Sequence, residues 1–271
     1  MNLLVFAGTT EGTALVQQAL AAGHTVTVSV ATEYGADILR QAVADRTEDV
    51  RILCGRLDAE AIAALVPPFD ALVDATHPYA AEVSAHLRAA SHRAAVPYFR
   101  LARAPQAVAA GRLREFDDLP ALVAALAGTT GNVFVATGSR SLASFAALPG
   151  WRERLFVRVL PSVESLEACR AAGIDPTHVI ALHGACSTPL NKSLFAEYGC
   201  RILVTKESGE AGGFAQKIAA AQELGMDIFA LRPPAEPVAQ DGTLFRSPDD
   251  LLAALHGHDL FSALSDFLGK A

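Results

Sequence analysis

Short apolar segments alternate with segments of helical periodicity along almost the whole chain. The first series gives expected strands at residues 2–7, 24–30, 50–54, 70–74 and 96–100, and expected helices at residues 11–22, 33–45, 58–65 and 79–93. Strands such as Ala71-Leu72-Val73 are apolar throughout, which is typical of parallel strands covered on both faces. This alternation predicts an α/β fold built on a mainly parallel sheet.

A second series of the same kind follows a break in this rhythm. The break is the stretch 105–111, which is rich in Ala, Pro and Gly and is expected to be a linker. Beyond it we expect strands at 132–136, 155–159, 178–182, 202–205 and 227–231, and helices at 117–127, 141–147, 163–172, 188–197, 213–224 and 248–256. Two such series predict two Rossmann-like, doubly wound domains with an active-site cleft between them, at the carboxyl ends of the strands.

The expected domain boundaries follow from the break between the two series. Residues 1–104 are predicted to form an N-terminal dinucleotide-binding domain, and residues 105–256 a C-terminal α/β domain that contributes cofactor and substrate contacts. The Pro-rich stretch 232–247 is expected to be a loop. Residues 257–271 are predicted to form a C-terminal tail, a short amphipathic helix that packs on the core, with contact to a partner as the alternative.

Composition excludes several classes of partner. Hydrophobic residues make up 51% of the 271 residues, enough for a substantial core, and the charged fraction of 19% argues against long disordered segments. The formal net charge is −7 and no run of Lys or Arg is present, so nucleic acid is not an expected partner. No apolar run approaches the roughly 20 residues of a membrane span, and no signal peptide is recognised. We therefore expect a cytoplasmic protein with no membrane partner.

The cysteines give no sign of a disulfide framework or of a metal centre. The four cysteines, Cys54, Cys169, Cys186 and Cys200, contain no C-x-x-C pair, which suits a reducing cytoplasm. His183 lies close to Cys186 in the sequence, but two ligands alone do not predict a zinc site. No metal is expected.

The first expected strand runs directly into a glycine-containing turn and a helix. A glycine there allows close approach of a ligand to the backbone, and the free N–H groups of the helix start attract phosphate. The motif is not the full G-x-G-x-x-G: Ala7 replaces the first glycine, and Gly8 and Gly12 have the spacing G-x-x-x-G. We predict that this turn binds a dinucleotide through Gly8, Thr9, Thr10, Glu11 and Gly12. The alternative is an ordinary tight turn that enters a helix.

The end of the second expected strand bears on the choice of cofactor. An acidic residue there holds the ribose 2′-hydroxyl in dinucleotide folds, and its absence leaves room for a 2′-phosphate. Here the hydroxyls of Ser29 and Thr32 precede the acidic Glu33, which stands one residue late. Ser29 and Thr32 are predicted cofactor contacts, and the cofactor is either NADPH or NADH.

The polar segment after the expected strand 70–74 is a candidate for the chemistry. His77 and Tyr79 are residue types that transfer protons, and we predict that both are catalytic. Asp74, Ala75 and Thr76 are predicted cofactor contacts. The alternative interpretation makes Asp74 the cap of the next helix and His77 a turn residue.

The turn after the expected strand 132–136 is a candidate anion site in the second series. Gly138 and Ser139 lie ahead of a helix, where backbone N–H groups form an anion nest, and Arg140 adds a fork of donors. All three are predicted cofactor contacts, although capping alone would explain Ser139.

The densest polar cluster follows the expected strand 202–205. Lys206 stands at the strand end, and the glycines that follow lead into a helix, an arrangement that can bind a carboxylate or a phosphate. We predict that Lys206 is catalytic and positions ligand, with Ser208, Gly209, Gly212 and Gly213 as cofactor contacts. The alternative is a solvated loop with a Lys–Glu pair.

Taken in order, these loops resemble the precorrin-6A and cobalt-precorrin-6A reductases of cobalamin (vitamin B12) biosynthesis. The matching segments are 6–12, 28–35, 55–58, 74–80, 96–98, 136–140, 157–161, 205–209 and 212–214. Ala7 departs from the double glycine of many members and resembles the variant of the cobalt-first, anaerobic branch. The stretch 183–187 departs from the loop that members often carry.

The resemblance implies a reaction and its participants. A reduced nicotinamide, NADPH or NADH, donates hydride to a double bond of a tetrapyrrole substrate, precorrin-6A or cobalt-precorrin-6A, and gives the 6B form. The cobalt-containing branch is favoured. His77, Tyr79 and Lys206 are candidates for proton delivery, beside solvent or a substrate carboxyl. Transient contacts with neighbouring pathway enzymes are also expected.

A substrate with many carboxylates requires a local gathering of cations in an acidic protein. The candidates near expected strand ends or loops are Arg100, Arg103, Arg140, Arg158, Lys192 and Lys206. Two rival interpretations remain at this level: a non-catalytic dinucleotide-binding sensor, and a different α/β enzyme that acts on a sugar or nucleotide.

Overall fold

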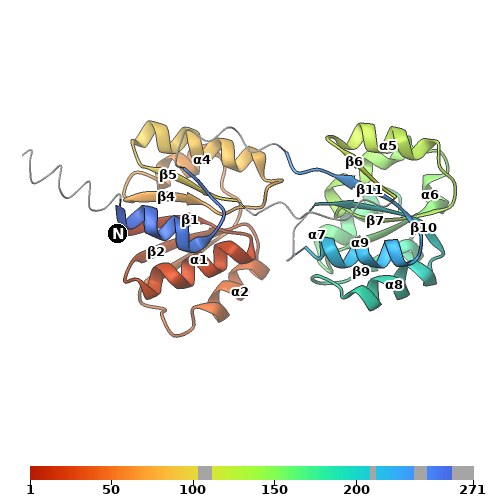
Figure 1. The fold of residues 1–271 in the computed structure, drawn as a ribbon. Coiled ribbons are helices and arrows are strands. Elements are labelled where there is room, and N and C mark those ends of the chain that lie inside the picture. Colours follow the sequence, from red (N-terminus) through yellow and green to blue (C-terminus); the bar gives the residue numbers. More distant parts are fainter. Residues whose placement is uncertain (103–111, 208–211, 235–242, 258–271) are drawn as a thin grey trace, which may run out of the picture. The chain divides into compact units, whose positions relative to one another are not determined.

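The chain folds as two compact units, each with its own sheet (Figure 1). The structure is a computed structural model that describes residues 1–102, 112–207, 212–234 and 243–257. Unit 1 combines Met1–Ala104 with Ala235–Ala271, and unit 2 is Pro105–Pro234.

Unit 1 is built on a parallel sheet with the strand order β12-β5-β4-β1-β2-β3. Its strands are β1 (Asn2–Phe6), β2 (Thr25–Val30), β3 (Val50–Cys54), β4 (Ala71–Asp74), β5 (Tyr98–Leu101) and β12 (Leu244–Phe245). Its helices are α1 (Thr10–Ala21), α2 (Glu33–Ala42), α3 (Ala59–Leu65) and α4 (Ala81–Ala94), and residues 248–257 are also helical.

The side chains of β1 alternate between two cores, one on each face of the sheet. Leu3 and Val5 pack with α1, α2 and the helical residues 248–257, whereas Leu4 and Phe6 pack with α3 and α4. Because helices cover both faces, the central strands are apolar at every position, as the sequence pattern indicates.

Unit 2 repeats this architecture with the strand order β6-β11-β10-β7-β8-β9, again parallel. Its strands are β6 (Leu113–Phe116), β7 (Asn132–Ala136), β8 (Leu155–Val159), β9 (Val179–Ala181), β10 (Cys200–Lys206) and β11 (Asp227–Leu231). The helices are α5 (Leu119–Ala127), α6 (Trp151–Arg154), α7 (Val163–Ala171), α8 (Thr188–Glu197) and α9 (Phe214–Glu223), with 3₁₀ turns η1 (Ser139–Ala147) and η2 (Pro176–His178). Helix α5, η1 and α7 pack on one face, and α8 and α9 on the other.

Side-chain caps fix where most of these helices begin. Thr9, Thr32 and Asp58 in unit 1 each accept a hydrogen bond from the backbone N–H three residues further on. Asp118, Ser162 and Ser187 do the same in unit 2. Each cap contributes about 1 kcal/mol to its helix. The helices therefore start directly after the loops at the carboxyl ends of the strands, which is where ligands bind in doubly wound folds.

The structure confirms the predicted fold class, an α/β fold with two doubly wound parallel sheets. Every expected strand is present, with ends shifted by a residue or two. Strands β6 and β12 were not expected, and the expected helix 141–147 is the 3₁₀ turn η1.

The last part of the chain belongs to the first unit, unlike the predicted C-terminal domain of residues 105–256. Residues 235–256 group with unit 1 because β12 pairs with β5, and because Leu251 and Leu255 are fully buried in the core beneath α1 and α2. The chain therefore leaves unit 1 after β5, builds unit 2 and returns to add an edge strand. The expected linker 105–111 and the tail beyond residue 257 lie outside the described residues.

Candidate functional site

The turn between β1 and α1 holds the predicted nucleotide loop. Thr9 caps the helix: its Oγ1 accepts a hydrogen bond from Gly12 N at 3.0 Å and donates to the carbonyl of Ala75 at 3.1 Å. Gly8 is exposed, and a Cβ added to it would meet no atom within 4 Å. Thr10 is exposed and Glu11 half-buried on the first turn. Open backbone beside a capped helix start is the geometry that phosphate binding needs.

Gly12 has a different reason to be glycine. A Cβ at Gly12 would lie 3.1 Å from the Cβ of Ala75, which is tighter than ordinary packing contacts. Gly12 is buried, so its missing side chain lets α1 pack closely against the chain that leaves β4. Gly12 therefore supports the structure of the loop, and its backbone N–H donates to Thr9 Oγ1, which caps α1.

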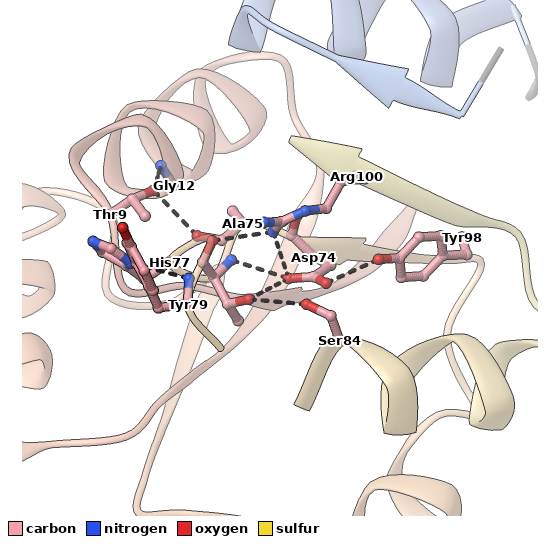
Figure 2. A network of polar contacts seen from close by, with 10 residues as sticks. Thr9, Gly12, Asp74, Ala75, His77, Tyr79, Ser84, Tyr98 and Arg100 are labelled. Atoms are coloured by element: carbon pink, nitrogen blue, oxygen red, sulfur yellow. Dashed lines mark hydrogen bonds and ion pairs between the residues drawn. The ribbon is translucent and has the colours of Figure 1, made fainter. Parts of the chain in front are cut away.

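The turn after β4 is organised by the carboxylate of Asp74, which has no exposed surface (Figure 2). Its Oδ1 accepts hydrogen bonds from Thr76 N at 3.0 Å, from Thr76 Oγ1 at 2.7 Å and from Arg100 Nη1 at 2.9 Å. Its Oδ2 accepts from the Tyr98 hydroxyl at 2.8 Å. Burial, with the Asp74 charge beside it, raises the pKa of Tyr98 far above its ordinary value, so the hydroxyl stays a donor.

This arrangement corrects two interpretations of Asp74. Its carboxylate is fully occupied inside the protein, so it supports the turn and does not reach a cofactor directly. The alternative that Asp74 caps the next helix is also wrong, because the N-cap position of α4 is Ala80, without a side-chain hydrogen bond. Ala75 and Thr76 are buried, with exposed fractions of 0% and 8%, so their part in the site is structural or through backbone groups.

His77 and Tyr79 lie together on the same turn. Their rings are tilted by 32° with centroids 5.4 Å apart, and Tyr79 N donates to His77 Nδ1 at 3.3 Å. Both are half-buried, so each keeps surface that a ligand can touch. Phe6 pairs with Asp74 in the sheet, and the nucleotide loop and the His77–Tyr79 turn therefore leave neighbouring strands at the same edge (Figure 2).

The two predicted contacts after β2 differ in exposure. Ser29 is buried, with 4% of its surface exposed, and pairs with Phe6 in the sheet. Thr32 is exposed and caps α2, where its Oγ1 accepts from Gly35 N at 3.2 Å. Their contact with a ribose stays a prediction.

The turn after β7 in unit 2 keeps the features of an anion nest. Gly138 has φ of 89°, a left-handed conformation that favours glycine, and a Cβ there would meet no atom within 4 Å. Ser139 Oγ donates to Ser165 Oγ at 3.4 Å, and Arg140 is exposed. Ser139 and Arg140 line a hollow of about 290 Å³ together with residues of α7.

Lys206 is the last residue of β10 and is half-buried. Burial lowers the pKa of its ammonium group. Gly213, the N-cap of α9, has φ of 63°, and a Cβ there would lie 3.0 Å from the Cβ of Ala185. Its glycine is thus required by backbone conformation and packing, whereas Gly212 is half-buried beside it. Ser208 and Gly209 lie outside the described residues.

The sequence pattern did not lead us to a further lysine, the buried Lys217 on α9. Only 2% of its surface is exposed, and burial, with the charges of Arg158 and Lys206, lowers its pKa to about 7. Arg158, Lys206 and Lys217 are called the basic cluster below. One signal was available: Phe214, Lys217, Ile218 and Ala221 have helical spacing, so this lysine stands on the apolar face of α9.

The neutral side chain of Asn191 holds Arg158 of the basic cluster in place. Arg158 Nη1 donates to Asn191 Oδ1 at 3.1 Å, and the Asn191 amide donates to the carbonyls of Cys186 at 2.8 Å and Ser187 at 3.0 Å. Asn191 is fully buried. Among the described residues, the charged and titratable groups that act on Lys217 are Arg158, Lys206 and the Cys186 thiol, with no carboxylate. An anionic ligand would balance the positive charge around Lys217.

Two of the other expected substrate cations, Arg100 and Lys192, are paired with carboxylates. Arg100 is buried in unit 1, with 4% of its surface exposed, and Lys192 is a half-buried residue of α8 whose Nζ lies 2.6 Å from Glu223 Oε2. Arg103 lies outside the described residues. Within the ranges that the structure describes, no group of three or more His, Cys, Asp or Glu residues could hold a metal, and no helix is long and apolar enough to cross a membrane.

Comparison with known proteins identifies the family. The model of the precorrin-6x reductases CbiJ/CobK matches residues 2–256. The chain belongs to this family. The resemblance seen in the loops is confirmed, and the chain is an oxidoreductase of cobalamin biosynthesis.

Individual relatives agree with the family assignment. A cobalt-precorrin-6A reductase of Priestia megaterium is 32% identical over 93% of this chain and 97% of its own. One of Methanothermobacter thermautotrophicus is 32% identical over 93% of this chain and 82% of its own. The solved structure of CobK precorrin-6A reductase has a TM-score of 0.74, with 24% identity over 95% of this chain and 97% of its own, and shows the same fold.

Proposed function

We propose that this precorrin-6x reductase uses NADPH or NADH to reduce a double bond of cobalt-precorrin-6A to give cobalt-precorrin-6B. The use of a dinucleotide cofactor is supported by the open backbone at Gly8 beside the capped start of α1. The cobalt form of the substrate is supported by the names of the two relatives at 32% identity.

The residues of unit 1 fit a dinucleotide. Gly8, Thr9 and Thr10 would place their backbone N–H groups against the pyrophosphate, and Ser29 and Thr32 would face the ribose. Bound in this way, the reduced nicotinamide supplies the hydride. The half-buried His77 and Tyr79 leave the sheet at the same edge, where they would orient the cofactor or deliver a proton.

The basic cluster of unit 2 would hold the tetrapyrrole by its carboxylates. Arg158, Lys206 and Lys217 concentrate positive charge in a protein whose net charge is −7, and the charges acting on Lys217 include no carboxylate of the described residues. Paired with substrate carboxylates, these cations would orient the macrocycle for hydride transfer. Lys206 is also a candidate proton donor, and contacts of Gly138, Ser139, Arg140, Gly212 and Gly213 with the cofactor remain part of the proposal.

Anaerobic absorption spectroscopy tests the proposal. The purified protein is mixed with cobalt-precorrin-6A or with metal-free precorrin-6A, each with NADPH and with NADH. Reduction of the cobalt form with consumption of nicotinamide is the expected result. A protein that binds dinucleotide but converts neither tetrapyrrole would be the sensor, and one with no affinity for the macrocycle would be a different α/β enzyme.

Replacement of Gly8 by Val should weaken nucleotide binding and leave the fold intact. The added side chain has room within the protein, but it would occupy the space through which a phosphate approaches. Loss of one hydrogen bond to the charged pyrophosphate costs about 1.5–3 kcal/mol, or roughly 10- to 150-fold in affinity. The measurement is the dissociation constant of NADPH.

Gly128→Val is the matched control for this change. Gly128 is an exposed glycine of unit 2 with φ of −83°, and a Cβ there would meet only one atom, at 4.0 Å. The control should bind NADPH like the unaltered protein. Equal NADPH affinity of a folded Gly8→Val protein would remove the nucleotide loop from the proposal.

A further inference from the structure

Arg100 lies at the carboxyl end of unit 1's sheet but points inward. Its side chain is 5% exposed, and its Nη1 reaches three acceptors: Asp74 Oδ1 at 2.9 Å, the Asp74 carbonyl at 3.1 Å and the Thr76 carbonyl at 3.0 Å. A guanidinium so placed is held by the turn that it binds, and it does not extend toward a ligand (Figure 2).

The contacts of Arg100 continue to the nucleotide loop. The turn from Asp74 to Thr76 includes Ala75, whose carbonyl accepts from Thr9 Oγ1 at 3.1 Å. The same Thr9 oxygen accepts from Gly12 N and so caps α1. The backbone of the turn from Asp74 to Thr76 therefore connects the guanidinium, which bonds Asp74 and Thr76, to the Thr9 cap of the helix that would bind the pyrophosphate.

The backbone of Arg100 is fixed on both sides. Arg100 pairs with Asp74 of β4, and Leu244 of the returning strand β12 pairs with Arg100 from the other side. Arg100 N donates to the carbonyl of Thr243 at 2.7 Å. Strand β12, which follows unit 2 in the sequence, is thus hydrogen-bonded to Arg100, the residue whose side chain binds the turn after β4.

We propose that Arg100 is a positioning residue for the dinucleotide: through the Asp74–Thr76 turn it holds the Thr9 cap of α1 in the geometry that binds the pyrophosphate, and it touches no ligand itself. This inference rests on the proposed cofactor site in unit 1. It also replaces the sequence-based expectation that Arg100 binds a substrate carboxylate.

The test compares Arg100→Lys and Arg100→Met with Ser91→Ala. Lysine keeps the charge that pairs with buried Asp74, but its shorter stem cannot reach all three acceptors, so this variant should fold. Ser91 is a buried residue of α4 whose Oγ donates to the Val96 carbonyl at 2.6 Å, and it has no hydrogen bond to the Asp74 network. It therefore controls for a general loss of stability in the same unit.

Arg100→Lys should raise the dissociation constant of NADPH about tenfold, the effect of losing roughly one well-aligned hydrogen bond. The KM of the tetrapyrrole should not change, and amide hydrogen exchange at Ala75, Thr76 and Gly12 should become faster. If Arg100→Met folds, its dissociation constant for NADPH should rise more than that of Arg100→Lys, because methionine provides neither a charge nor a donor. Lysine at this position would then preserve part of the function of Arg100. Ser91→Ala should lower the melting temperature without a change in NADPH affinity.

Four outcomes would overturn the inference. A raised, salt-dependent KM for the tetrapyrrole with unchanged NADPH affinity would mean that Arg100 binds the substrate directly. Reduced stability with both affinities unchanged would mean that Arg100 is only structural. Loss of NADPH affinity in Gly8→Val but not in Arg100→Lys would keep the proposed function and reject the positioning role, whereas an unaltered protein that binds no dinucleotide would reject both.

Discussion

Between pH 7 and pH 9, the stability of the protein should rise by up to roughly 1.4 kcal/mol per pH unit because of Lys217 alone. The ordinary pKa of lysine is 10.5, and burial beside Arg158 and Lys206 lowers that of Lys217 to about 7. Over the interval between these values the unfolded chain binds a proton that the folded protein does not. The folded state bears the full cost of a buried ammonium group below pH 7, and this cost falls as the pH rises.

Chemical denaturation at several pH values measures this effect. The slope of the unfolding free energy against pH should be lower in Lys217→Met than in the unaltered protein. Lys192→Met, which changes a lysine of α8 whose side chain is 40% exposed, should keep the slope of the unaltered protein. The range stops at pH 9 because burial raises the pKa of Cys200 to about 12, so that this thiol gives the opposite slope at higher pH. Identical slopes for the unaltered protein and Lys217→Met would show that Lys217 keeps its proton in the folded state.

Binding of the substrate to the basic cluster should change the slope of the unfolding free energy against pH. A bound polycarboxylate would favour the protonated ammonium of Lys217, so saturation with the tetrapyrrole should flatten the dependence between pH 7 and pH 9. Binding of the substrate would then be accompanied by uptake of a proton, which calorimetry in buffers of different ionisation enthalpy can detect.

The fold was predictable because its strands are buried on both faces. A strand such as β4 must be apolar at every position when helices cover both sides, and that run stands out between polar turns. Strand β12 carries no such signal: it has two residues, and its partner β5 lies far away in the sequence. The membership of residues 243–257 in unit 1 therefore depends on tertiary pairing, which local patterns do not report.

The candidate site was predictable in its loops but not in the direction of each side chain. The sequence placed Asp74 and Arg100 at strand ends, where α/β proteins bind ligands, but a strand end also suits a buried ion pair. Only the structure shows that the guanidinium turns inward to the carboxylate. Lys217 was missed because a lysine in a helix is most often a surface residue, and its position on an apolar stripe was not used. The cleft expected between the two domains stays a prediction.

Replacement of Lys206 by Ala should weaken binding of the ligand that Lys206 holds by roughly 10- to 150-fold, which corresponds to the loss of a charge-assisted hydrogen bond worth about 1.5–3 kcal/mol. The proposed ligand is the tetrapyrrole, so its KM should rise while the KM of NADPH stays the same. A fall in kcat as well would mean that orientation or proton delivery also depends on Lys206. Lys192→Ala removes a lysine that faces Glu223 and should leave both constants unchanged.

The titration of Lys217 provides an independent measurement of whether Lys206 belongs to the basic cluster or to a solvated loop. The charge of Lys206 lowers the pKa of Lys217, so Lys206→Ala should move the titration of Lys217 to higher pH, even without substrate. In that variant, the rise in stability between pH 7 and pH 9 should therefore begin at a higher pH. A raised KM together with this shift would place substrate and Lys217 around the same ammonium group. Unchanged KM values and an unchanged titration would leave Lys206 as a lysine of a solvated loop, and the basic cluster would lose its place in the proposed function.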